Sequence, residues 1–584
     1  MTARAVAATG LSPAISTAIS SGRMELVNVR QRLLLMAKSR VLWVLALFAG
    51  IAFVAVLRIG FLGFVEQDAP RSRSMAEALL PPRGEIVDRN GVPLARAFPA
   101  YALWFNPGAL GEGSPLVKSP EEVAAALVRI FPDENYERLV TRLRAGKPAY
   151  LRRRILPEDA NRIHALGEPA LEFPRENERF YPQGSMAAHI LGFVAADGHG
   201  RIGMEQVYDK RLTDPATRAA PAVLSIDARV QGALEDELGR GMAETNAIGA
   251  AGIILDVDTG EVLALASLPS FNPNLIDQAG AANIFNRVTN QVYELGSTFK
   301  PLTVAAAIDA GVVSNFARRY PADRPLSIGG FQIRDSHNYG ASLNVAETLI
   351  HSSNIVTAQI ADELGSERLN ATMRSLGMNE RPYIELPAKG FPLWPKGHWS
   401  RITTMTVSYG HGIAVTPLHL ASAYAAMVNG GIWRPATLEK VDRDHVPGGR
   451  RVWKASTSAR MRQLLRMIVV DGTGKKADAP GFRVGGKTGS AEKPGAGGYR
   501  RTSLVATFAA AFPMDRPRYV IISMLDEPKG TVATSGQRTA AWNAAPIVGR
   551  VVPRIGPLLG VMPDDSRDVD ISDLSPLVRD GEGE

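Results

Sequence analysis

The chain has 584 residues, 45% of them hydrophobic and 21% charged, which predicts two or three folded domains and excludes a largely disordered protein. It contains no cysteine, and this excludes disulfides, thiolate catalysis and metal sites built on cysteine. The formal net charge is +8 although residues 564–584 form an acidic tail, but no basic run with interleaved aromatic residues occurs, which disfavours a nucleic-acid-binding protein.

An apolar segment near the N-terminus predicts a single transmembrane anchor. Residues 41–57 carry no charge, and the side chain of Arg58 can reach the interface, so the predicted span covers residues 41–65. Residues 1–40 contain six basic residues and one acidic residue, which predicts a cytoplasmic tail and an extracytoplasmic remainder. A cleaved signal peptide and a buried core helix are the alternatives.

Residues 66–220 predict a domain without a catalytic constellation. After a polar linker, a short apolar strand leads into Asn90-Gly91, which is a strong hairpin signal, and residues 92–95 supply the return strand. The stretch that follows mixes helical windows with loops rich in proline and glycine. Composition alone favours a structural or interaction domain.

A second domain is predicted over residues 221–563. Asp227 can cap a helix whose apolar positions recur every four residues. Further strands are predicted over 252–257, 261–267, 483–486, 504–512 and 519–525. Strands at both ends with helices between them predict an α+β fold, in which helices flank an antiparallel sheet.

Ser297 and Lys300 are a candidate nucleophile and base. In Ser-x-x-Lys the two side chains lie one helical turn apart on one face. Because proline is tolerated only in the first turn, Pro301 predicts that the helix begins near Ser297, at the positive end of the helix dipole. A lysine accepts a proton at neutral pH only if burial or a nearby cation lowers its pKa, and Lys487 is the candidate cation.

Two further polar motifs follow along the chain. Ser352-Ser353-Asn354 lies between two apolar helical windows, where a polar turn can point into a cleft; a buried capping serine is the alternative. Lys487-Thr488-Gly489 follows a short strand, where the glycine lets a substrate backbone approach and the lysine offers a charge to a carboxylate.

Competing motifs fail on their flanks. Residues 481–488 match a phosphate-binding loop, but no apolar strand precedes them and no helix follows. A second Ser-x-x-Lys, residues 490–493, is followed by Pro494-Gly495 rather than by a helix. No Gly-x-Ser-x-Gly elbow and no His-Glu-x-x-His occurs, so neither a Ser-His-Asp hydrolase nor a zinc site is expected.

Together these residues resemble the class B penicillin-binding proteins, and within that class they are most similar to the division-specific, FtsI-type peptidoglycan D,D-transpeptidases. The similar segments are residues 83–95, 179–182, 192–209, 251–274, 293–301, 408–417 and 487–490. The resemblance implies a cytoplasmic tail, an anchor, a pedestal domain of the class B dimerisation type, a penicillin-binding transpeptidase domain and an acidic tail, over 1–40, 41–65, 66–220, 221–563 and 564–584.

The resemblance also implies a reaction, namely acyl transfer on the D-Ala-D-Ala end of a peptidoglycan stem peptide, without metal or cofactor. Ser297 would attack the penultimate D-Ala carbonyl, and Lys300 would take its proton. The implied catalytic residues are Ser297, Lys300, Ser352, Asn354 and Lys487, and the implied substrate-binding residues are Thr488, Gly489 and Ser490. The backbone N–H groups of Ser297 and Ser490 would form the oxyanion hole. Leu295 and Ser490 depart from the common family residues without affecting these roles.

The implied location is the inner membrane, with the catalytic domain in the periplasm. The implied partners are stem peptides, β-lactams, the inner membrane, a membrane-embedded glycosyltransferase and other divisome proteins, with no nucleic acid. Four alternatives stay open: an elongation-type class B transpeptidase, a membrane-anchored serine β-lactamase, a D,D-carboxypeptidase, and a β-lactam sensor or scaffold.

Overall fold

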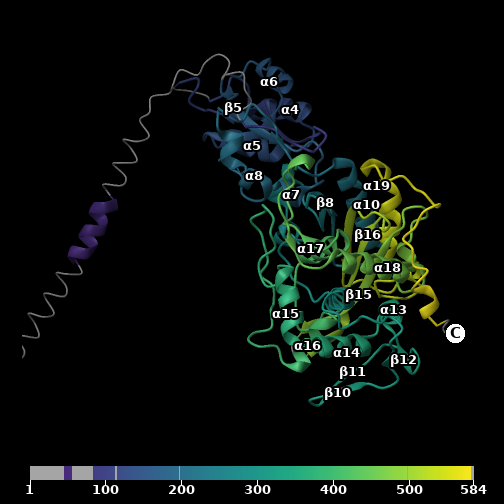
Figure 1. Ribbon diagram of the computed structural model, residues 1–584. Coiled ribbons are helices and arrows are strands. Elements are labelled where there is room, and N and C mark those ends of the chain that lie inside the picture. Colours follow the sequence, from purple (N-terminus) through teal and green to yellow (C-terminus); the bar gives the residue numbers. More distant parts are fainter. Residues whose placement is uncertain (1–44, 56–82, 112–114, 196, 496–497, 580–584) are drawn as a thin grey trace, which may run out of the picture. The chain divides into compact units, whose positions relative to one another are not determined.

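The computed structural model describes residues 45–55, 83–111, 115–195, 197–495 and 498–579 (Figure 1). Residues 45–55 are helical, whereas the rest of the predicted anchor and the predicted cytoplasmic tail lie outside the described residues. No helix in the described part of the chain is both long enough and apolar enough to cross a membrane. The chain divides into two compact units, Met1–Leu79 and Leu80–Glu584, and all elements below belong to the second.

A first sheet is built around a long strand. β1 (Ile86–Val87) and β2 (Pro93–Phe105) pair antiparallel and confirm the hairpin predicted at Asn90-Gly91. The φ of Gly91 is 85°, which glycine adopts at no steric cost. β2 also pairs with three further strands, and helices pack on this sheet over a buried apolar cluster. These strands and helices are β3 (Ala149–Ile155), β4 (Leu171–Glu172), β5 (Arg175–Phe180), α4 (Pro120–Ile130), α5 (Tyr136–Arg144) and α6 (Pro157–His164).

Buried ion pairs hold the region after this sheet. Short helices follow β5, namely α7 (Ala188–Leu191), α8 (Gly203–Val207) and α9 (Asp209–Thr213). Arg83 and Arg179 each donate from Nε to the carboxylate of Glu205, over 2.8 and 2.6 Å. Arg83 also donates to Asp209 over 2.8 Å. Since Glu205 has no exposed surface, its carboxylate pairs with both guanidinium groups away from water, and Asp209 supplies a second negative charge to Arg83.

The hairpin turn of the first sheet is tied to the second domain. Asp88 accepts a hydrogen bond of 3.0 Å from the N–H of Ala228, and Asn90 donates to Asp227 over 2.9 Å. In addition, β6 (Ala222–Val223) pairs in parallel with β1. The first sheet therefore continues past residue 221, where the sequence predicted the second domain to begin.

A second sheet of five strands, all antiparallel, has the order β15-β16-β17-β7-β8. The strands are β7 (Gly249–Asp256), β8 (Val262–Leu268), β15 (Gly485–Gly495), β16 (Gly498–Phe512) and β17 (Tyr519–Asp526). This confirms the predicted antiparallel sheet. The strand predicted to end at Gly486 instead continues through Lys487-Thr488-Gly489, because those residues stay paired with β16.

Helices cover both faces of the second sheet. On one face lie α10 (Ala228–Thr245), which Asp227 caps as predicted, and α19 (Ala544–Ile555), side by side in Figure 1. On the other face lie α17 (Pro417–Val428) and α18 (Ala455–Val470), with α12 (Lys300–Asp309) packed behind them. Phe508 packs in the apolar cluster on the side of α10 and α19, and its neighbour Ala509 packs in the cluster on the side of α17 and α18. The strands are therefore apolar on both faces.

In the sequence, the remaining elements lie between β8 and β15. A helical part contains α11 (Ala281–Ile284), α13 (Val345–Ile350), α14 (Asn354–Leu364), α15 (Ser366–Ser375) and α16 (Arg401–Ser408). Small two-stranded ribbons accompany these helices: β9 (Tyr320–Pro321) with β12 (Ser342–Leu343), β10 (Leu326–Ile328) with β11 (Phe331–Ile333), and β13 (Ile432–Trp433) with β14 (Arg450–Arg451).

The described part of the predicted acidic tail packs against α18. Arg466 pairs with Asp568 over 2.7 Å, and Arg460 pairs with Asp573 over 2.5 Å. Leu574 is buried in the same apolar cluster as Ala509. Two acidic residues of this segment therefore pair with basic residues of α18.

Replacing Glu205 by glutamine tests the buried ion pairs. The variant leaves buried Arg179 without its carboxylate and Arg83 with Asp209 alone, so we expect the free energy of unfolding to fall by about 3 kcal/mol. Urea denaturation followed by tryptophan fluorescence measures this change. The matched control is Glu85→Gln, which breaks an exposed pair with Arg96 and should change stability by less than about 1 kcal/mol. Equal effects of the two substitutions would contradict the assignment.

Candidate active site

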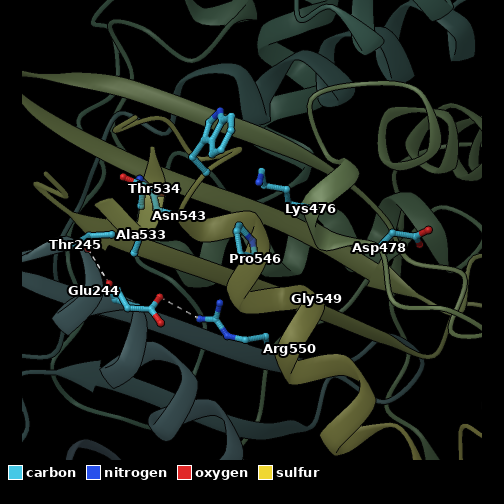
Figure 2. A pocket seen from close by; sticks show the side chains of 12 residues that line it. Glu244, Thr245, Lys476, Asp478, Ala533, Thr534, Asn543, Pro546, Gly549 and Arg550 are labelled. Carbon is cyan, nitrogen blue, oxygen red and sulfur yellow. Dashed lines mark hydrogen bonds and ion pairs between the residues drawn. The ribbon is translucent and has the colours of Figure 1, made fainter. Parts of the chain in front are cut away.

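A cavity between α10 and α19 is not the predicted site. It has a volume of about 420 Å³ and is lined by charged and polar side chains, among them Glu244, which pairs with Arg550 (Figure 2). Nζ of Lys476, another residue that lines the cavity, lies 3.9 Å from the centre of the Trp542 ring. None of the residues of the three polar motifs lines this cavity.

Ser297 lies on a single turn of 3₁₀ helix, Gly296–Phe299, that leads directly into α12. The sequence predicted a helix start near Ser297, whereas the α-helix itself begins at Lys300. The reason is Pro301, which has no N–H to donate to the Ser297 carbonyl in an α-helical bond. That carbonyl accepts the N–H of Lys300 instead, which tightens the turn.

The turn that carries Ser297 is fixed from two sides. Tyr424 of α17 donates its hydroxyl to the Thr298 carbonyl over 2.8 Å. On the other side lies β15, where a Cβ on Gly489 would lie 2.4 Å from the Leu295 carbonyl oxygen. The approach is too close for any side chain, so the glycine of Lys-Thr-Gly lets the strand pack directly beside the serine turn.

Two buried lysines converge on one hydroxyl group. Lys300 donates to Ser352 Oγ over 3.1 Å and also to the Ser352 carbonyl. Lys487 donates to the same Oγ over 2.9 Å and to the Thr488 carbonyl over 3.1 Å. Both lysine side chains are fully buried. The structure thus brings all three motifs of the sequence together in one place.

Burial lowers the pKa of both lysines, and the charge of Lys487 adds to this effect at Lys300. Burial, reinforced by the charge of Lys487, holds the pKa of Lys300 well below its ordinary value, while the carboxylate of Asp335 acts in the opposite direction. Burial lowers the pKa of Lys487 to about 7. Burial and the charge of Lys300 also lower the pKa of His411. An amine beside the serine turn is therefore available in neutral form near neutral pH.

The three residues of the Ser352-Ser353-Asn354 turn make different contacts. Ser353 is the buried capping serine that the sequence offered as an alternative, since its Oγ accepts the N–H of Val356 in α14. Ser352 has a φ of 63°, a left-handed conformation that is uncommon outside glycine and that turns its side chain toward the lysines. Asn354 donates its amide to the Arg334 carbonyl over 2.9 Å.

The two other predicted substrate-binding side chains lie along β15. The Thr488 hydroxyl is within 2.7 Å of the Thr473 hydroxyl and accepts from Lys487 over 3.3 Å. Ser490 accepts the N–H of Ala540 over 3.0 Å through its Oγ.

Two residues that contact this site, and one that lies beside it, were not predicted from the sequence. Asp335 contacts Ser353 and Asn354, Thr473 contacts Thr488, and Glu294 accepts hydrogen bonds from Gly412 and Tyr499 beside the serine turn. Thr473 lies in a Gly-Thr-Gly turn after α18, which signals a turn but not its partner. Asp335 and Glu294 carry no local signal, because their partners are distant in sequence.

Within the ranges that the structure describes, no group of three or more histidine, aspartate or glutamate side chains could hold a metal ion.

Comparisons with known proteins agree on one family. A family model of the penicillin-binding protein transpeptidase domain matches residues 250–549, and one of the penicillin-binding protein dimerisation domain matches residues 78–215. The chain is 40% identical over 529 residues to the probable peptidoglycan D,D-transpeptidase FtsI of Caulobacter vibrioides, covering 88% of this chain and 87% of the relative. It is 30% identical over 524 residues to the peptidoglycan D,D-transpeptidase FtsI of Escherichia coli strain K12, covering 86% and 87%.

Solved structures give the same result. Penicillin-binding protein 3 of Mycobacterium tuberculosis, in its complex with aztreonam, matches with a TM-score of 0.64 and 25% identity. The match covers 84% of this chain and 99% of the other.

The lysine pair predicts a titration that can be measured directly. In NMR spectra of protein labelled with ¹³C at lysine Cε, one lysine resonance should titrate near pH 7. This resonance should be absent from the spectra of Lys487→Met. In that variant the pKa of Lys300 should rise, because removal of a neighbouring positive charge favours the protonated amine. A Lys487 that titrates near the ordinary lysine value of ~10.4 would contradict the electrostatic description.

Proposed function

Because the chain belongs to the penicillin-binding protein transpeptidase family, we propose that it is a class B peptidoglycan D,D-transpeptidase that cross-links stem peptides during septal wall synthesis. The observation that carries this proposal is the pair of buried lysines that share the Ser352 hydroxyl beside the serine turn. Such an arrangement supplies a neutral amine as base and a cation for an anionic substrate group.

Acylation begins at Ser297. Its hydroxyl attacks the penultimate D-Ala carbonyl while neutral Lys300 accepts the hydroxyl proton. The tetrahedral intermediate collapses when the peptide bond breaks, and the leaving D-Ala amine takes a proton that Ser352 relays from the lysines. The product is a Ser297 ester of the stem peptide. An amine of a neighbouring stem then attacks this ester, which forms the cross-link and restores the Ser297 hydroxyl.

Substrate binding uses the strand beside the serine. Lys487 and Thr488 bind the terminal carboxylate, Asn354 holds the substrate amide, and Gly489 lets the peptide backbone approach β15. The N–H groups of Ser297 and Ser490 donate to the oxyanion, an interaction typically worth about 3 kcal/mol for each donor. β-Lactams acylate the same serine.

The remainder of the chain serves location and assembly. Residues 1–40 form a cytoplasmic tail, 41–65 a single anchor in the inner membrane, 66–220 the pedestal, 221–563 the periplasmic transpeptidase domain, and 564–584 the acidic tail. A membrane-embedded glycosyltransferase and other divisome proteins are the proposed partners. The names of the FtsI relatives support duty at division rather than in elongation.

Labelled penicillin tests the nucleophile. The wild-type protein should retain a covalent label, and Ser297→Ala should take none, because the acceptor oxygen is gone. Ser270→Ala is the matched control, since Ser270 begins another Ser-x-Asn sequence and should label normally. Label retained by Ser297→Ala would identify a different nucleophile, and rapid loss of label from the wild type would favour a β-lactamase.

Depletion in the source bacterium tests the division role. Loss of septal cross-linking should block constriction while side-wall growth continues, so cells should become filaments as observed by phase-contrast microscopy. Round, swollen cells would assign the protein to elongation instead.

A further inference from the structure

Asp335 reaches the Ser352-Ser353-Asn354 turn from the segment that follows β11. Its Oδ2 accepts the Ser353 hydroxyl over 2.6 Å. Its Oδ1 accepts the N–H of Asn354 over 2.5 Å and that of Ile355 over 3.1 Å. One carboxylate therefore holds three donors at the start of α14, where the backbone N–H groups have no partner within the helix.

These contacts bear on the conformation of Ser352. This residue keeps a left-handed φ of 63°, which costs about 1 kcal/mol or more for a residue with a Cβ, so the surrounding contacts must hold it there. The next two residues are fixed by Asp335, and the Ser353 hydroxyl in turn holds the N–H of Val356. Asp335 is thus connected through one residue to the hydroxyl on which both lysines converge.

The charge of Asp335 also acts on Lys300. Lys300 has Lys487 on β15 and Asp335 after β11 as its charged neighbours, and its own charge acts on His411 in the loop after α16. Asp335 is the acidic group that favours the protonated form of Lys300, against burial and Lys487.

We propose that Asp335 is a positioning residue of the reaction: its carboxylate fixes the turn that presents the Ser352 hydroxyl, and its negative charge opposes the positive charge of the lysine site at Lys300. This inference rests on the proposed function, since it takes Ser297 as the nucleophile and Lys300 as its base. Asp335 contacts neither Ser297 nor Lys300 directly. It acts through its hydrogen bonds with Ser353 and Asn354 and through its charge.

Asp335→Asn separates the charge from the shape. The amide oxygen can still accept both backbone N–H groups, and only the hydrogen bond from the Ser353 hydroxyl is lost. The turn should therefore persist, and the maximal acylation rate should stay within about threefold of the wild type. Loss of the negative charge favours the neutral form of Lys300. The acid limb of the acylation rate against pH should therefore move to lower pH.

Asp335→Ala removes the hydrogen bonds as well. Because the turn loses three contacts, the maximal acylation rate should fall about tenfold or more at every pH. Thermal unfolding shows whether this variant is folded, and if it is not, the asparagine variant alone decides the proposal.

The experiment measures acylation by labelled penicillin at saturating concentration from pH 5 to 9, so that binding does not enter the rate. Glu347→Gln is the matched control, because Glu347 is another carboxylate that caps a neighbouring helix, in the capping box of α13, but it does not act on Lys300. Its substitution should leave the midpoint of the acid limb unchanged.

A lower midpoint for Asp335→Asn alone would support the charge role, and a slow Asp335→Ala would support the positioning role. Coincident midpoints for the wild type and Asp335→Asn would overturn the charge role. An Asp335→Ala variant as fast as the wild type would overturn the positioning role. Ser297→Ala separates this inference from the proposed function: if that variant still takes label, the nucleophile is wrong, whereas an unlabelled Ser297→Ala with an unshifted Asp335→Asn overturns only the role of Asp335.

Discussion

The site depends on one hydroxyl group, Ser352 Oγ, that receives hydrogen bonds from two fully buried lysines. A buried ammonium group is costly, and two that face each other across a single hydroxyl are more so. The arrangement is least costly when one amine is neutral, and a neutral amine is what a serine nucleophile requires of its base. The fold thus provides a base at neutral pH through burial rather than through histidine.

The surrounding structure serves to keep three distant segments at this point. α12 supplies Lys300, the edge strand β15 supplies Lys487, and the turn before α14 supplies Ser352. A sheet that is apolar on both faces and covered by helices gives β15 a rigid support. Close packing at Gly489 then sets the serine turn directly against that strand.

Local features of this fold were predictable because their causes are local. The hairpin at Asn90-Gly91 and the helix cap at Asp227 follow from the conformations that those residues favour. Pro301 indicated a helix start but not the 3₁₀ turn before it, which becomes clear only when the partner of each N–H is counted. The extension of β15 and the packing of the acidic segment on α18 depend on tertiary pairing, and a single sequence carries no signal for it. Asp335 was missed for the same reason, since it caps a helix from 19 residues away.

Mapping the covalent adduct on the unmodified protein tests the central claim most directly. The wild-type protein would be acylated with penicillin, digested, and analysed by tandem mass spectrometry to locate the penicilloyl group. The account predicts the adduct on Ser297, the serine whose turn lies beside the lysine pair. An adduct on Ser352 or Ser490 would contradict it, because the nucleophile would then be a different serine from Ser297, which lies on the turn that leads into α12.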